Sequence, residues 1–471
     1  MLVQRESRKR QRRRLLEPMF SISLLLYPAA PPFTADALIL QAGQRLPPLR
    51  STPGAAYQNK DGGPVSLLEL PAVEEWATAE NLKERHLKTL YRELLRRPND
   101  DADNMSQPSL FQRLIDQDFP KSAASSLLLH NDQFKFVECT SSVVATSPSQ
   151  RGCKLAIQYG AEGPIVETVL IRHAADNDVD TESAGSDSDR YTVCVSCQHG
   201  CSRGCTFCET GTMGLRSSLS SGQILEQVFH AERYLARQSA GAVRNVVFMG
   251  QGEATDTYET VHEACRGLTH QCLFGLAAKQ ITISTVGSSP DRIRDLADDM
   301  PGVSLALSLH GATQELREEL IPSARGVKGT ALSELSDALD YHTTVTGRGV
   351  MIEYLLIAGV NDDDAAADAL GTFCLERQRK QMKKGRNSSV TYVNLIPYNP
   401  TSAGDRFDYE TPSDESIEAF ASKLRDVYGV RTLVRWSSAD GRDANGACGQ
   451  LVTSITGAAA GAQKGGSEAV K

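Results

Sequence analysis

The chain lacks any run of apolar residues long enough to cross a bilayer. The longest such stretch near the start, Met19–Ala30, contains two Ser and a Pro and falls short of the roughly 18 to 20 residues that a membrane-spanning helix needs. An excess of basic charge is also missing, because 50 Lys and Arg stand against 58 Asp and Glu, with a net charge of −8. Any contact with nucleic acid must therefore come from a local basic patch.

Cysteine is sparse, and 11 in 471 residues are too few for a disulfide-stapled secreted scaffold. Their distribution is nevertheless uneven, because five lie close together: Cys194, Cys197, Cys201, Cys205 and Cys208. Clustered thiols favour metal or redox chemistry in a reducing compartment over structural bridges. We expect an intracellular location: the cytoplasm, or the plastid stroma or mitochondrial matrix if the basic start of the chain is a transit peptide.

The length allows two or three domains, at roughly 100 to 200 residues per domain. We expect a disordered basic arm or transit peptide over 1–60 and a small helical accessory domain over 61–150, where apolar residues recur at helical spacing. Linking strands and an acidic insertion follow over 151–190. We expect the remaining parts to be a larger core domain over 191–452 and a Gly/Ala-rich, disordered tail over 453–471.

In the core, short β-rich runs alternate regularly with helical stretches. Such an alternation predicts parallel βαβ units, an α/β fold and a partial or full barrel. In barrels of this kind the functional groups gather at the carboxyl ends of the strands. The expected strands cover 191–195, 243–249, 280–285, 303–309, 350–356 and 390–396.

Three cysteines follow the first strand of the core at short, regular spacings. Cys201, Cys205 and Cys208 are separated by three and then two residues. A cubane iron–sulfur cluster has four irons, so three thiolates leave one iron open to a small molecule, whereas structural zinc normally takes four protein ligands. Cys197 is a candidate fourth ligand, and a zinc-stabilised RNA-binding module therefore stays open as an alternative.

This spacing, after the first strand of a βα repeat, resembles the radical S-adenosylmethionine (SAM) superfamily. Further motifs narrow the resemblance to the RlmN/Cfr family of RNA adenosine methyltransferases, and they occur in the family's order. Several ordered motifs together are much harder to obtain by chance than any one alone. They are Cys194–Cys201, Gly204–Gly211, Met249–Glu253, Ile283–Gly287, Ser308–His310, Val393–Pro400 and Ala447–Leu451.

The resemblance implies a partial (β/α) barrel of the radical SAM type with a small helical N-terminal accessory domain. It assigns a 4Fe-4S cluster to the three spaced cysteines, with the open iron bound to SAM. The family's target is a ring carbon of adenine, which is not nucleophilic enough to take a methyl cation directly. The family instead loads a methyl group onto a protein cysteine, here Cys448, from which a 5'-deoxyadenosyl radical takes a hydrogen.

The resemblance also gives roles to two residues outside the cluster motif. Once the methylene group has joined the adenine, Cys194 would release the RNA by forming a disulfide bond with Cys448. Glu167 matches the family's base, which takes the proton that leaves the substrate carbon. Cys197 stands where relatives commonly carry Ser, so which of the two thiols resolves the adduct stays open.

For SAM, the resemblance assigns residues at or just beyond the predicted strand ends. Among them, Glu253 can accept a hydrogen bond from the ammonium group of SAM. Ala254 follows it where RlmN-like members commonly carry Pro and Cfr-like members carry Ala, so methylation at carbon 8 is an alternative to carbon 2, which we favour. The assigned residues are Gly252, Glu253, Ser284, Ser308, Leu309, His310 and Asn394.

The expected substrate is adenosine in 23S-type large-subunit rRNA, with tRNA as a further candidate, and the expected electron donor is a flavodoxin or ferredoxin. No membrane partner is expected, and a monomer is the default. A different radical SAM activity, without a need for Cys448 and Cys194, is a further alternative. Candidate phosphate contacts are the basic residues Arg377, Arg379, Lys380, Lys383, Lys384, Arg386, Arg431 and Arg435.

Overall fold

The computed structural model describes the larger part of the chain. The described residues are 65–95, 107–117, 119–129, 134–135, 139–146, 152–160, 163–173, 189–325, 331–383, 391–435 and 450–451. The predicted basic arm and C-terminal tail lie outside them, and so does Cys448. The domain boundaries expected from the sequence stay a prediction.

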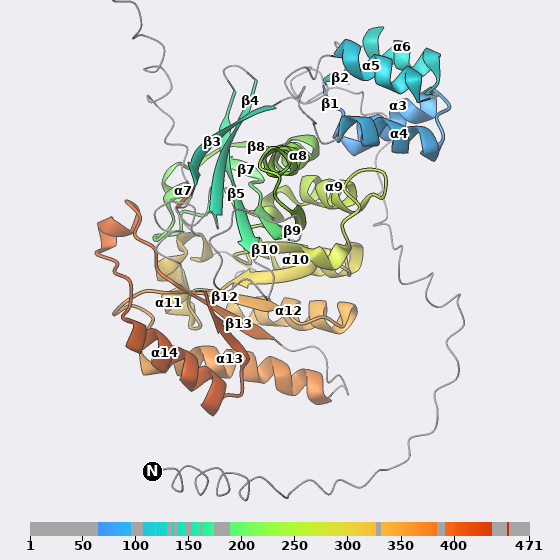
Figure 1. Ribbon diagram of the computed structural model, residues 1–471. Coiled ribbons are helices and arrows are strands. Elements are labelled where there is room, and N and C mark those ends of the chain that lie inside the picture. Colours follow the sequence, from blue (N-terminus) through green and yellow to red (C-terminus); the bar gives the residue numbers. More distant parts are fainter. Residues whose placement is uncertain are drawn as a thin grey trace, which may run out of the picture. The chain divides into compact units, whose positions relative to one another are not determined.

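A mixed sheet of ten strands forms the centre of the fold (Figure 1). Six of its strands were expected as the parallel core, and parallel pairing indeed runs from β6 through β9 to β14. The sheet continues beyond β6 through the antiparallel strands β5, β4 and β3. In sheet order the strands are β14 (Thr432–Val434), β13 (Tyr392–Pro397), β12 (Met351–Leu356), β11 (Ser304–Ser308), β10 (Ile281–Thr285), β9 (Ala242–Phe248), β6 (Arg190–Cys194), β5 (Ile165–His173), β4 (Gly152–Tyr159) and β3 (Cys139–Thr146).

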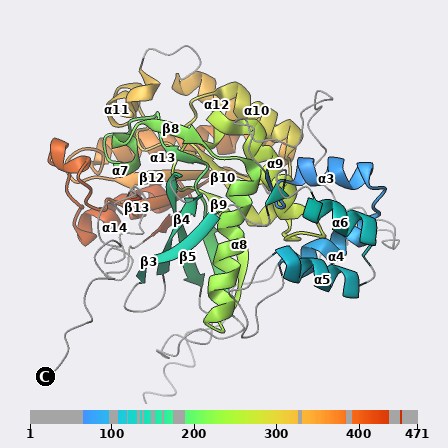
Figure 2. The same ribbon diagram turned by 90° about the horizontal axis from the view of Figure 1, so that it is seen from above.

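Helices follow the parallel strands, which confirms the predicted α/β architecture. Each connection returns the chain to the start of the next strand, so neighbouring strands run in the same direction. Helices α10 and α12 lie side by side (Figure 2). The helices of this part are α7 (Glu209–Thr212), α8 (Ser221–Arg237), α9 (Tyr258–Thr269), α10 (Pro290–Asp299), α11 (Gln314–Leu320), α12 (Leu332–Thr346), α13 (Asp364–Lys383) and α14 (Asp414–Ser422).

The fold also contains short strands, the amino-terminal helices and several short helical turns. A hairpin of β7 (Gln198–Gly200) and β8 (Leu215–Ser218) flanks the loop that carries Cys201, Cys205 and Cys208, which we call the thiol loop. Strand β1 (Val65–Ser66) pairs with β2 (Phe134–Lys135). The amino-terminal helices are α3 (Leu70–Ala79), α4 (Glu84–Leu94), α5 (Gln107–Asp116) and α6 (Lys121–Leu129). The 3-10 helices are η1 (Ala254–Thr257), η2 (Ala278–Gln280), η3 (Pro322–Ala324) and η4 (Gly404–Phe407), and η5 (Lys423–Val427) is a π-helix.

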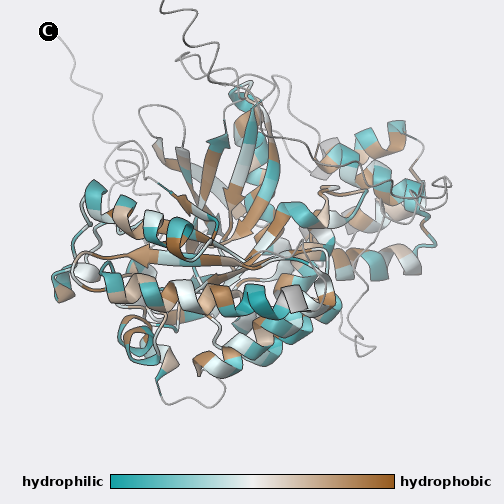
Figure 3. Ribbon diagram, turned by 90° about the horizontal axis from the view of Figure 1, so that it is seen from below, coloured by the Kyte–Doolittle hydropathy of each residue, from teal (hydrophilic) through white to brown (hydrophobic). Residues whose placement is uncertain are grey.

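Side chains alternate between the two faces of the parallel strands. In β11, Leu305 and Leu307 are buried in the hydrophobic core, whereas Ser304 and Ser308 occupy the opposite face. Figure 3 shows strands that are largely hydrophobic and helices with mixed polar and apolar faces. We call the face opposite to the helix-covered core the inner face, and it carries the polar side chains.

The amino-terminal helices are tied to the core by polar contacts. The Glu69 carboxylate, just before α3, accepts a hydrogen bond of 2.6 Å from the backbone N–H of Gly222 and another from the Ser221 hydroxyl. Both donors belong to the first turn of α8, where backbone N–H groups lack partners within the helix. Glu74 in α3 also forms an ion pair with Arg266 in α9, at 3.0 Å. None of the described helices is long and apolar enough to cross a membrane.

We expect the Glu69→Ala substitution to lower the free energy of unfolding by about 2 kcal/mol, because it removes a charged acceptor from a helix N-terminus. Urea denaturation measures this change. The matched control is Glu75→Ala on the exposed side of the same helix, which should change the free energy by less than about 0.5 kcal/mol. Equal effects of the two substitutions would contradict the anchoring role of Glu69.

Candidate functional site

The three spaced cysteines lie on one loop between β7 and α7. Burial raises the pKa of the Cys201 thiol to about 12, and it raises the pKa of Cys205 and Cys208 as well. The neighbouring thiols raise the pKa of Cys205 further. The Cys208 backbone N–H donates to the Cys205 carbonyl at 3.1 Å, so the loop turns tightly between these two cysteines. Three thiolates can coexist here only beside a compensating positive charge.

The donor set fits a 4Fe-4S cluster. Its three thiol sulfurs are soft ligands on one loop, and the irons of a cluster would supply the missing positive charge. Among the described residues, no three His, Cys, Asp or Glu side chains are arranged to hold a single metal ion. Cys197 differs from the three, since it is buried and its thiol donates to the carbonyl of Gln251 at 3.7 Å.

Glu253 lies at the start of η1, beyond the carboxyl end of β9, and is almost fully buried. One carboxylate oxygen accepts from the backbone N–H and hydroxyl of Thr255, at 3.1 and 2.6 Å, and the other accepts from the Val286 N–H at 3.0 Å. Its charge raises the pKa of Cys201 and Cys205, so it lies near the thiol loop. Gly252 precedes it with a φ of +105°, and an added Cβ would come within 2.7 Å of Gln198.

Two predicted SAM residues, Ser284 and Ser308, are the second-last and the last residue of neighbouring strands, and they face one another. Their hydroxyl oxygens lie 3.2 Å apart. Ser308 is in register with Glu353 on β12, which is in register with Asn394 on β13. The amide of Asn394 donates to both carboxylate oxygens of Glu353, at 3.1 and 2.9 Å. Sequence reasoning missed Glu353, a buried acid whose pKa is raised mainly by burial.

His310 lies just after the end of β11, and its side chain contacts a residue of the thiol loop. It adopts a left-handed backbone, with a φ of +57°, and its ring packs edge-on against Phe207 at 4.8 Å between centroids. Its Nδ1 accepts from the Leu355 N–H at 3.0 Å, so Nε2 carries the proton of the neutral ring. Burial lowers the pKa of His310 to about 3. Leu309, also predicted, is fully buried, and its carbonyl accepts from the Arg317 guanidinium at 2.9 Å.

Cys194 lies at the end of β6, in a small apolar cluster with Val169 and Leu451. The Leu451 carbonyl accepts a hydrogen bond of 2.6 Å from the hydroxyl of Thr210, two residues beyond the last cysteine of the thiol motif. The structure therefore brings together the predicted resolving cysteine, the thiol loop and the residue three positions after Cys448, which itself lies outside the described residues.

Glu167 lies on β5 and is fully buried. Its carboxylate forms an ion pair of 3.0 Å with Lys154 on β4, which is 4% exposed. Sequence reasoning missed this lysine. The available signal was a charged residue inside a strand that is otherwise mostly buried and apolar.

Comparisons with known proteins agree with this geometry. Residues 195–370 match the family model of the radical SAM superfamily. A protein of Frankia alni named probable dual-specificity RNA methyltransferase RlmN is 41% identical over 305 residues, which are 64% of this chain and 64% of the relative. The protein of the same name from Mycolicibacterium vanbaalenii is 40% identical over 62% of this chain and 71% of its own.

Two further matches extend over more of the chain. The protein named probable dual-specificity RNA methyltransferase RlmN from Synechococcus elongatus is 35% identical over 397 residues, which cover 83% of this chain and 94% of the relative. The crystal structure of a radical SAM methyltransferase from Sphaerobacter thermophilus matches 82% of this chain and 99% of its own, with a TM-score of 0.65 and 30% identity. The chain belongs to the RlmN family of radical SAM RNA methyltransferases. A non-enzymatic zinc-stabilised module is inconsistent with this membership.

The basic residues expected to contact RNA differ in the solvent exposure of their side chains in this RlmN family member. Arg377 is buried, with its guanidinium 3.4 Å from the ring centre of Phe373, so its predicted contact with phosphate is wrong. Arg379 is exposed, and Lys380 is exposed and paired with Asp340. The Lys383 side chain, Lys384 and Arg386 lie outside the part of the chain that the structure describes.

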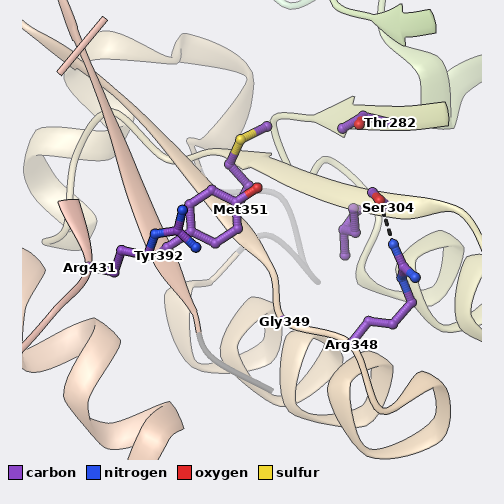
Figure 4. Close-up of a pocket in the computed structure, with 8 residues that line it drawn as sticks. Thr282, Ser304, Arg348, Gly349, Met351, Tyr392 and Arg431 are labelled. Carbon is purple, nitrogen blue, oxygen red and sulfur yellow. Dashed lines mark hydrogen bonds between the residues drawn. The ribbon is translucent and has the colours of Figure 1, made fainter. Parts of the chain in front are cut away.

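A cavity of about 340 Å³ opens on the inner face, at the amino ends of β10 to β13 (Figure 4). Arg348 donates to the Ser304 hydroxyl at 2.7 Å, and the Arg431 guanidinium lies 5.7 Å from the ring centre of Tyr392. Neither arginine forms an ion pair with a carboxylate among the described residues, so the cavity carries positive charge. The other lining residues are Thr282, Leu305, Gly349 and Met351.

Replacing one cysteine at a time tests the cluster ligands. We expect Cys205→Ala to remove the cluster, because Cys205 is one of three sulfurs on the loop, and iron and labile sulfide then fall to background in protein purified without air. The matched control is Cys197→Ala, which should keep its iron, because the Cys197 thiol is bonded to a backbone carbonyl. Loss of iron from the control would instead make Cys197 a ligand.

Proposed function

We propose that this family member methylates carbon 2 of an adenine in large-subunit rRNA, and also acts on tRNA, through a methyl group carried by Cys448. The observation that carries the proposal is the contact between Leu451 and Cys194 beside the thiol loop. Leu451 is three residues from Cys448, and three residues span at most about 11 Å. The length of chain between Leu451 and Cys448 would therefore allow Cys448 to reach Cys194, as a disulfide between them would require.

Cys201, Cys205 and Cys208 would hold the cluster. SAM would lie against Gly252 and Glu253, along the inner face at Ser284, Ser308 and Asn394, and next to Leu309 and His310 in the loop after β11. When bound, the cluster and SAM supply the methyl group and the radical that activates it. Glu253 is anchored by backbone donors, so it offers a fixed negative charge to an ammonium group. An external donor such as a flavodoxin or ferredoxin would supply electrons.

Glu167 would act as the base that takes the proton from the target ring carbon. It lies on β5 two residues before Val169, and residues two apart in a strand point to the same face. Val169 pairs directly with Cys194 across β5 and β6. The base and the resolving cysteine therefore share one face of the sheet, where the methylated Cys448 would meet the adenine.

We expect the peptide that contains Cys448, from protein purified without air, to carry an added methyl group, together with about four irons per chain. Mass spectrometry and iron and sulfide assays measure both. Iron with an unmodified Cys448 would keep the radical SAM assignment and argue against transfer through this cysteine. Zinc without sulfide would overturn both statements.

Methylation at carbon 8 is the alternative regiochemistry, and chromatography of the nucleosides from treated RNA separates the two products. Ala254, the residue that raises this alternative, is buried at the first position of η1. An 8-methyladenosine product would overturn the choice of carbon 2 and leave the mechanism unchanged.

The cationic cavity would hold a phosphate of the RNA next to the target nucleotide. We expect the double variant Arg348→Ala/Arg431→Ala to weaken RNA binding for all sequences and to reduce the slope of log affinity against log salt by about 1 to 2. Titration of labelled RNA at several salt concentrations measures both. Arg294→Ala on the outer helix α10 is the control, and an equal effect there would argue against the cavity.

A further inference from the structure

Two charged side chains are buried against each other in the antiparallel part of the sheet. Lys154 Nζ lies 3.0 Å from Glu167 Oε1, with the side chains 4% and 0% exposed. Moving two charges out of water costs several kcal/mol per ion, and a buried ion pair stabilises a fold little more than apolar side chains of the same size would. Stability alone therefore gives little reason for a lysine in this strand.

The pair is positioned beside the proposed reaction centre by the strand register. Lys154 on β4 is opposite Val169 on β5, and Val169 is opposite Cys194 on β6. Directly opposite residues of neighbouring strands point to the same face. Lys154, Glu167 and Cys194 therefore share one face, on which Leu451 packs against Val169 and Cys194.

We propose that Lys154 is a positioning residue for methyl transfer, whose ammonium group holds the Glu167 carboxylate ionised and oriented until it takes the proton of the substrate carbon. This inference rests on the proposed function. In the proton transfer, the bond between carbon and hydrogen breaks, its electrons stay on the substrate, and the proton bonds to a Glu167 oxygen. Lys154 keeps its own protons and acts only through Glu167.

Other ionisable groups occupy the same face further along the strands. His173 on β5 lies 2.8 Å from the Thr192 hydroxyl on β6, and burial together with Arg435 and Arg190 lowers its pKa. Cys194 is the ionisable side chain nearest in register to the pair. Lys154 is the group whose positive charge directly contacts Glu167.

The test compares Lys154→Met with Lys154→Arg in the full-length holoenzyme. A buried carboxylate that loses its neighbouring ammonium favours the protonated form, which is not a base. We therefore expect Lys154→Met to move the acid limb of the pH–rate profile of RNA methylation upward by about 1 to 3 pH units. At a pH below both limbs the rate should fall by about 10- to 1000-fold, and at pH 7 the loss should be smaller. Lys154→Arg should restore most of the rate and the original profile.

Two readouts separate this role from a structural one. Methylation of Cys448 does not use the base, so Lys154→Met should carry the same Cys448 methyl group as the wild type. Adding Lys154→Met to Glu167→Gln should cause no further loss, because Lys154 acts through the carboxylate. If Lys154→Met does not fold, Lys154→Gln retains a hydrogen-bond donor without the charge, and we expect the same shift of the acid limb.

The outcomes distinguish this inference from the proposed function. An unmethylated Cys448 in the wild type would overturn the proposed function. A fully active Glu167→Gln would overturn the assignment of the base and, with it, the role of Lys154. An inactive Glu167→Gln together with a wild-type pH profile for Lys154→Met would overturn only the role of Lys154.

Discussion

The alternation of side chains along the strands is the constraint on which the site depends. Because every second residue of a parallel strand points away from the helices, Leu305 and Leu307 can complete the core while Ser308, the last residue of β11, remains on the inner face. The same geometry sets Glu353 beside Ser308 and Asn394 beside Glu353. Residues distant in sequence thus form one polar surface without interrupting the core.

Three buried carboxylic acid side chains near the proposed site each have a hydrogen-bond or ion-pair partner. Glu253 accepts from backbone N–H groups, Glu353 accepts from Asn394, and Glu167 pairs with Lys154. Each buried carboxylate needs such donors, because an unsolvated charge without them is strongly unfavourable. The thiols of the cluster loop would obtain the corresponding compensation from iron.

The sequence predicted the parallel core and the radical SAM class, because hydrophobic periodicity and motif spacing are local properties of the chain. The sequence did not predict the burial or the hydrogen-bond partner of a residue where these depend on side chains distant in the sequence. Arg377 belongs to a run of basic residues that is typical of a solvent-exposed helix surface, yet its side chain is buried against Phe373. Glu353 stands in an ordinary β-rich run, and only the pairing of β12 with β13 gives it Asn394 as a partner.

By itself, the sequence determined the three spaced cysteines, the alternation of strands and helices in the parallel core, and the family. The tertiary structure alone decided that Leu451 contacts Cys194, that the thiol loop binds the Leu451 carbonyl through Thr210, and that Lys154 faces Glu167. These contacts join residues on different strands and loops. They arise from strand register and chain closure, which no local pattern of residues encodes.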